Sequence, residues 1–157
     1  CDASYGSDPI KGRSRTGFVA FIGGGPVSWT TKLQATVATC TAHSEYMAMG
    51  EAAKEIVYLR MYQEELTGES VDHPTILSGD NMPSIKVATK SASKMKHIQM
   101  RYHYIRHCCE EGKIHVQHVP SQHNIADGLT KHLESTKTKQ FALGLFKDDP
   151  PHTQDTQ

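Results

Sequence analysis

The stretch GFVAFIGGGPVSWTT occupies residues 17–31 and predicts a β-hairpin. Residues 17–22 and 27–31 are two β-prone runs, and the glycines and proline between them are typical of a turn. A phosphate-binding loop is the alternative for these glycines. Such a loop needs a Lys-Ser/Thr pair and a helix directly after it, and neither is present. We therefore interpret 23–26 as the hairpin turn.

Further strands and helices are expected on both sides of this hairpin. The other β-prone runs bounded by turn residues are 2–5, 75–78 and 114–119. The segments with apolar residues at helical spacing are 41–66, 83–88, 98–111, one from about Ile125, and a last one that ends near Leu145 or Phe146. Strands interleaved with helices predict an α/β fold with a mixed sheet.

Length and composition predict one globular domain over residues 1–146, followed by a disordered polar tail over 147–157. Lysine plus arginine and aspartate plus glutamate number 17 each, so net charge indicates no particular partner. No apolar segment is long enough to cross a membrane, and the four cysteines form no CxxC pair. We expect a protein of the cytoplasm or nucleus that is not secreted. The start at Cys1, without methionine, suggests a piece excised from a longer polypeptide.

Four carboxylates fall at the ends of predicted elements, where they can converge: Asp2, Glu45, Asp80 and Asp127. Asp80 follows the strand at 75–78, and sites in open α/β sheets form beyond the carboxyl ends of strands. Converging carboxylates repel one another and need cations. Two Mg²⁺ ions, with Mn²⁺ as a substitute, would neutralise them and could assist a phosphodiester displacement.

Each carboxylate also has a purely structural interpretation. Asp127 lies three residues after Asn124, an arrangement that stabilises a helix start. Glu45 could compensate a helix dipole, Asp80 could form a turn with its neighbour, and Asp2 could lie in a frayed terminus. Spacing alone leaves these alternatives open.

Seven runs in the chain carry a resemblance to a known family. They are CDASY (1–5), RTGFVAFIGGGPVSW (15–29), SEYMAMGEAAK (44–54), GDN (79–81), KHIQMRYHYIR (96–106), EGKI (111–114) and VPSQHNIADGLTK (119–131). Together, and in this order, they resemble the ribonuclease H domain of Ty1/copia-type retrotransposon Pol polyproteins. The resemblance implies a ribonuclease H-like fold with a five-stranded mixed sheet flanked by helices.

The same resemblance implies an activity, a metal requirement and partners. It implies hydrolysis of the RNA strand of RNA/DNA hybrids with two Mg²⁺ ions, next to the reverse transcriptase domain of the same polyprotein, in the cytoplasm within a virus-like particle or in the nucleus. Asp2, Glu45, Asp80 and Asp127 match the metal-binding carboxylates of the family. His123, in a shortened loop, is a candidate for assisting product release, and a plain exposed loop histidine is the alternative.

The chain departs from the family pattern at several positions. His43 and Gln99 stand where acidic residues are common, and His132 stands where proline is common. The family's first strand begins several residues before its aspartate, so we expect either a shortened first strand or another segment that fills the gap, and in both cases reduced stability. Adding the missing upstream residues should raise the melting temperature.

The segment after Asp80 is the candidate surface for the hybrid. No acidic residue lies between Asn81 and Cys109, and the basic residues there include Lys86, Lys90, Lys94, Lys96, Arg101 and Arg106. Lysine and arginine contacts with phosphate supply much nucleic-acid affinity. Asn81 is a candidate for contacting the 2′-OH that distinguishes RNA. A solvated helix face is the alternative for the lysines.

Competing functions remain at this point. The histidines His97, His103 and His107 could suggest zinc, since His103 and His107 lie one helical turn apart and Cys108 adjoins them. The glutamate of HExxH is missing, however, and no third ligand is evident. A catalytically silent module of the same fold, binding nucleic acid or stabilising a polyprotein, is the main alternative to a nuclease. A decayed transposon fragment without activity is the third hypothesis.

Overall fold

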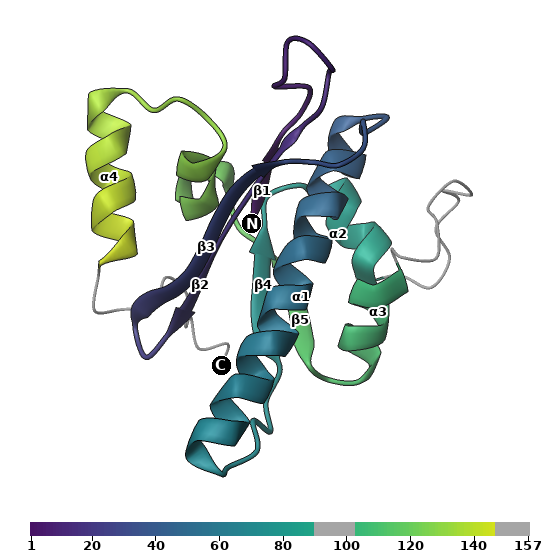
Figure 1. Cartoon of the computed structure of the whole chain (residues 1–157), viewed down its shortest axis with the longest axis vertical. Coiled ribbons are helices and arrows are strands. Elements are labelled where there is room, and N and C mark those ends of the chain that lie inside the picture. Colours follow the sequence, from purple (N-terminus) through teal and green to yellow (C-terminus); the bar gives the residue numbers. More distant parts are fainter. Residues whose placement is uncertain (90–102, 147–157) are drawn as a thin grey trace.

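A computed structural model describes residues 1–89 and 103–146 of the chain (Figure 1). The strands are β1 (Asp2–Ser4), β2 (Arg15–Ile22), β3 (Gly25–Leu33), β4 (Thr75–Gly79) and β5 (Ile114–His118). The helices are α1 (Thr41–Thr67), α2 (Met82–Thr89), α3 (His103–Glu110) and α4 (Ser135–Leu145), with two 3₁₀ helices, η2 (Ser121–His123) and η3 (Ile125–Leu129). The α/β class and the predicted order of elements are confirmed.

The predicted hairpin is formed by β2 and β3, which pair antiparallel from Arg15↔Leu33 to Ile22↔Gly25. Gly23 and Gly24 in its turn have positive φ angles of 60° and 83°, which glycine adopts without strain. The short strand β1 adds to the other edge of β2 by pairing Asp2 with Gly17 and Ser4 with Arg15. These strands form a three-stranded antiparallel sheet.

The long helix α1 supplies the centre of the core. Its buried face includes Met49, Ala52, Ala53 and Ile56, at the spacing that places residues on one side of a helix. The helix ends at Gly68, whose φ of 71° and N–H bond to the Glu64 carbonyl form a left-handed C-cap. Figure 1 shows α1 crossing the middle of the molecule, with α2 and α3 on one side and α4 on the other.

The prediction of one five-stranded sheet was wrong for the strands that the structure describes. β4 and β5 pair parallel in a separate two-stranded sheet. The physical reason is the length of β1, which spans three residues and pairs only with β2. A single bond, from the Cys1 ammonium to the Ser78 carbonyl at 2.8 Å, joins the start of the chain to β4.

A groove of about 570 Å³ lies between β2 and β4. Its walls include residues 18–24 of one sheet and 75–78 of the other, and Cys1 lies in its lining. Residues 18–22 of β2 pair with β3 on one side, but within the described residues their opposite edge and the facing edge of β4 have no strand partner. The groove is therefore bounded by two open backbone edges.

The helices expected in the second half of the chain agree only in part with the structure. The helix expected from Ile125 is the 3₁₀ helix η3, and Gly128 in it allows the Phe141 ring of α4 to pack closely. Residues 98–102 of the expected helix at 98–111 and the tail at 147–157 lie outside the described residues. None of the described helices combines the length and apolar character needed to span a membrane.

Candidate metal centre

Three of the four predicted carboxylates meet in space. Asp2 is in β1, Glu45 is in the second turn of α1, and Asp80 directly follows β4. One carboxylate oxygen from each lies within 4.8 Å of the others. Asp2 and Glu45 are 1% and 6% exposed, so these are buried acids rather than surface charges. The frayed-terminus and surface-charge alternatives for these two residues do not fit this burial.

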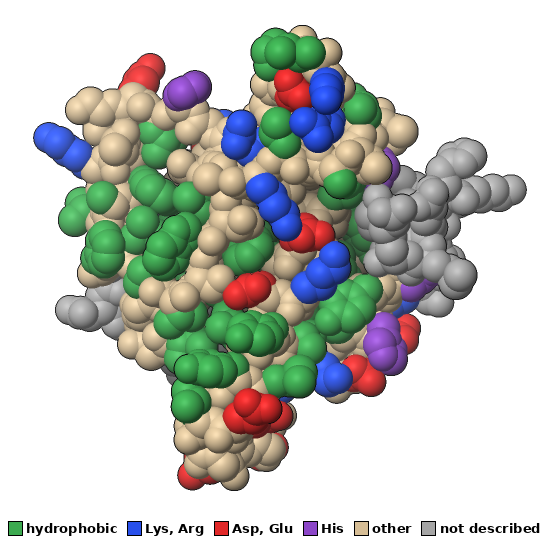
Figure 2. Space-filling view, in the orientation of Figure 1, with side chains coloured by type: hydrophobic (Ala, Val, Ile, Leu, Met, Phe, Trp, Pro, Cys, Tyr) green, Lys and Arg blue, Asp and Glu red, His purple; other side chains and the backbone are tan. Residues whose placement is uncertain are grey.

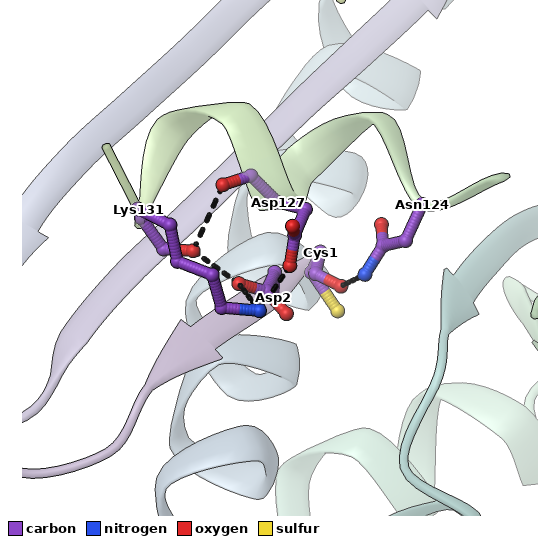
Figure 3. Close-up of polar contacts among 6 residues, drawn as sticks. Cys1, Asp2, Asn124, Asp127 and Lys131 are labelled. Carbon is purple, nitrogen blue, oxygen red and sulfur yellow. Dashed lines mark hydrogen bonds and ion pairs between the residues drawn. The ribbon is translucent and has the colours of Figure 1, made fainter. Parts of the chain in front are cut away.

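Asp2 is held in place by contacts to both sheets. Its strand pairs with β2, and the Cys1 ammonium before it donates to the Ser78 carbonyl of β4 at 2.8 Å. The Asn124 side-chain amide donates to the Cys1 carbonyl at 3.0 Å (Figure 3). The Asp2 backbone is thus fixed by elements far apart in the sequence, which keeps its carboxylate directed at the other two.

Asp127 lies beside this cluster and is not one of the three converging acids. It is in η3, and its carboxylate contacts the Lys131 ammonium (Figure 3). The same ammonium is 4.0 Å from the Asp2 carboxylate. The helix-capping alternative is not observed, because Asn124 makes no side-chain cap bond and instead holds Cys1.

Burial and mutual repulsion dominate the electrostatics of the centre. Burial, followed by the charges of Asp2 and Asp80, raises the pKa of Glu45 to about 8. Burial also raises the pKa of Asp2, against the opposing effects of a hydrogen bond from the Thr130 hydroxyl and the charge of Lys131. Near neutral pH, the protein alone does not fully compensate the negative charge of this cluster.

The donor set suits a hard divalent cation. The three converging ligands are carboxylate oxygens, which Mg²⁺ and Mn²⁺ prefer. Raised carboxylate pKa values show that added positive charge would be favourable there. Among the described residues, no comparable cluster contains histidine or cysteine, and His107 instead lies 3.3 Å from the Glu111 carboxylate. The zinc hypothesis therefore has no support in this part of the chain.

Only some of the predicted substrate-binding residues lie within the part of the chain that the structure describes. Lys86 is exposed on α2. The Asn81 side chain accepts a bond from the Ser84 N–H at 3.0 Å and so caps α2. His123 is exposed in η2, with its Nε2 3.1 Å from the Gln122 amide nitrogen. The predicted basic residues that lie outside the described residues are Lys90, Lys94, Lys96 and Arg101.

The chain resembles known proteins over nearly all of its length. Over 153 residues, or 95% of the chain, it is 29% and 30% identical to the retrovirus-related Pol polyproteins from transposons RE2 and RE1 of Arabidopsis thaliana. Over 132 residues, or 83% of the chain, it is 33% identical to the one from transposon TNT 1-94 of Nicotiana tabacum. The chain is similar to one segment of transposon Pol polyproteins.

This Pol-like segment is a small part of its relatives. It spans 10% of the length of each of the three polyproteins. No protein-family model matches the chain. The similarity is therefore to one short region of these retroelement polyproteins.

Two residues next to the centre, Thr130 and Lys131, were not predicted from the sequence. The Thr130 hydroxyl donates to the Asp2 carboxylate, and Lys131 lies between Asp127 and Asp2. The only local signal was the spacing of Asp127 and Lys131, four residues apart. Such pairs are common on helix surfaces, and the contacts to Asp2 join residues about 130 positions apart in the sequence.

Gly17 makes a close approach that aligns η3 with β1. A Cβ atom there would lie 2.7 Å from Thr130 Cγ2 and 2.9 Å from Leu129 Cβ. We therefore expect Gly17→Ala to push η3 away from Asp2, lowering the melting temperature by roughly 5 °C and weakening Mn²⁺ binding. Thermal melts and Mn²⁺ titrations would measure both effects.

Gly50→Ala is the matched control for this substitution. Gly50 lies inside α1 with no atom within 4 Å of the added Cβ, so alanine should maintain or slightly raise stability. If Gly17→Ala behaves like Gly50→Ala in both measurements, the close approach does not position η3.

Proposed function

We propose that this segment is a metal-dependent endonuclease that hydrolyses the RNA strand of RNA/DNA hybrids, as the ribonuclease H region of a Ty1/copia-type Pol polyprotein. The main observation that supports this function is the convergence of Asp2, Glu45 and Asp80 from three separate elements. The similarity to transposon Pol polyproteins supports the same proposal, because an element that copies RNA into DNA produces such hybrids. The reverse transcriptase domain of the same polyprotein is the proposed neighbour.

In this mechanism, the carboxylates hold cations and form no covalent intermediate. Two bound Mg²⁺ ions would supply an activated water and stabilise the leaving 3′ oxygen. Asp2 belongs to the cluster with Glu45 and Asp80 and also lies 4.0 Å from the Lys131 ammonium, which contacts Asp127. Glu45 must release its proton to act as a ligand, because its raised pKa keeps it largely protonated near neutral pH.

The proposed substrate contacts come from the region after Asp80. Lys86 is exposed on α2, the helix that begins two residues after this carboxylate. On the face shown in Figure 2, lysine and arginine side chains are interspersed with acidic ones rather than gathered in a single patch. We therefore propose that hybrid affinity depends on lysines and arginines of residues 86–101, together with the neighbouring reverse transcriptase.

Cleavage of a labelled RNA/DNA hybrid tests the proposed function directly. The unsubstituted protein should cut the RNA strand with Mg²⁺ or Mn²⁺ and should not cut with EDTA. Asp80→Asn should lower the rate at least about 100-fold, because one ligand oxygen becomes a neutral amide. Asp72→Asn is the matched control, since Asp72 is an exposed carboxylate just before β4 and should be replaceable without loss.

The same assay separates the nuclease from the silent module. Circular dichroism must first show that each variant is folded. A folded protein that binds the hybrid but does not cut it, alone or joined to its reverse transcriptase, would contradict the proposed activity and favour a catalytically silent nucleic-acid-binding module.

A further inference from the structure

Lys131 places a positive charge at the carboxylate centre. Its Nζ atom contacts the Asp127 carboxylate and lies 4.0 Å from Asp2 Oδ2 (Figure 3). The lysine side chain is 46% exposed, whereas the Asp2 side chain is 1% exposed. The ammonium therefore reaches from the surface to a buried acid. An ordinary exposed pair four residues apart would have no such third partner.

The Lys131 charge is not fixed in the backbone. Lys131 follows η3 and holds its ammonium on a flexible four-carbon stem, so it can turn toward solvent while the backbone stays in place.

The position of Lys131 also matters for a divalent ion. Asp2 and Asp127 would hold such an ion through carboxylate oxygens, and the ammonium contacts or approaches oxygens of both residues. Ammonium and metal ion are both attracted to the same negative charge, and they cannot occupy the same space. Binding of one must therefore weaken binding of the other.

We infer that Lys131 is a tethered cation that partly neutralises the carboxylate centre at Asp2 and Asp127 in the metal-free protein and is displaced when a divalent ion binds there. This inference rests on the proposed metal centre and adds a residue that sets its metal affinity. In this arrangement, the Lys131 ammonium offsets part of the charge of the buried acids before a metal ion binds. The cost of displacing the lysine makes metal binding weaker than the carboxylates alone would allow.

Lys131→Met tests this competition, because methionine keeps an unbranched stem without the charge. Mn²⁺ affinity, measured from the electron paramagnetic resonance of free Mn²⁺, is expected to become about tenfold tighter in the variant. Mg²⁺ should also raise its melting temperature more than that of the unsubstituted protein. Lys32→Met is the control, because Lys32 is an exposed lysine paired with Glu51 at 2.7 Å. Its affinity should be unchanged.

The Lys131 side chain can also be observed directly. In the unsubstituted protein, the Cε resonance of Lys131 should shift as Mg²⁺ is added, while that of Lys32 should not. If Lys131→Met is poorly folded, Lys131→Gln replaces it in the same titrations.

The outcomes distinguish this inference from the proposed function. Equal or weaker Mn²⁺ binding by a folded Lys131 variant, with normal binding by the unsubstituted protein, would overturn the inference and leave the metal centre standing. If neither the unsubstituted protein nor the Lys131 variants bind Mn²⁺ or Mg²⁺, the metal centre itself is wrong. If the Lys131 variants bind Mn²⁺ or Mg²⁺ and the unsubstituted protein does not, the lysine prevents metal binding altogether, which would support the inference.

Discussion

Glu45→Gln is expected to melt at a higher temperature than the unsubstituted protein at pH 8 in EDTA, and the difference should shrink toward pH 5. The pKa of Glu45 is raised to about 8 from an ordinary value of 4.5, chiefly by burial. Between pH 4.5 and about pH 8, Glu45 keeps a proton in the folded protein that it releases in the unfolded chain. Stability contributed by this group is therefore lost as pH rises through the window. Glutamine has the same shape and no such proton.

The expected effect is large for a single substitution. A pKa raised from 4.5 to about 8 corresponds to on the order of 5 kcal/mol across the window. In a protein of this size, that difference amounts to roughly 10 °C in melting temperature. Melting curves of both proteins at each pH between 5 and 8 would measure it.

Two comparisons make this result specific to Glu45. Burial lowers the pKa of the Cys1 ammonium, which makes stability change with pH in the opposite direction, and the difference between variant and parent at each pH removes the part of this effect that the two proteins share. Glu65→Gln, at an exposed position of the same helix, should show a difference that does not change with pH. Saturating Mg²⁺ should raise the melting temperature of the unsubstituted protein more than that of Glu45→Gln. A Glu45→Gln difference that stays constant from pH 5 to 8 would contradict the raised pKa.

Local sequence signals predicted the parts of the fold that local interactions determine. The glycines at 23–25 predicted the hairpin turn, and the structure has positive φ angles at Gly23 and Gly24. The apolar spacing over 41–66 predicted α1, which ends one residue later at Thr67. In both cases, the residues that specify the element lie within it or next to it.

The sheet was less predictable because strand pairing depends on contacts between distant residues. Nothing local to β4 shows that its free edge faces a groove rather than another strand. The convergence of Asp2, Glu45 and Asp80 was expected from their places at element ends, and the structure brings them together. Asp127 lies outside this cluster and contacts Lys131, which also approaches Asp2, 129 positions earlier in the chain.

A chain extended before Cys1 by four β-prone residues, such as Thr-Val-Ile-Val, is expected to melt on the order of 5–10 °C higher in EDTA. The extension can continue β1 antiparallel to residues 18–22 of β2 and pair with the open edge of β4. Its side chains would fill the groove of about 570 Å³, whose walls include Phe18, Ile56 and Ile125. It would also replace the buried Cys1 ammonium by an amide that can make the same bond to the Ser78 carbonyl.

An extension of the same length made of glycine and proline is the control for this prediction. Proline has no N–H for a ladder, and glycine brings no side chain to fill the groove, so this extension should give little or no gain. Extra protection of the backbone amides of residues 18–22 and 75–78 from hydrogen exchange should accompany the higher melting temperature. Equal melting temperatures for the two extensions would mean that the groove does not accept a strand. A gain with the β-prone extension alone would show that the two sheets can be joined through the strand that carries Asp2, which would make the stability of the fold and the geometry of the carboxylate centre depend on the same segment.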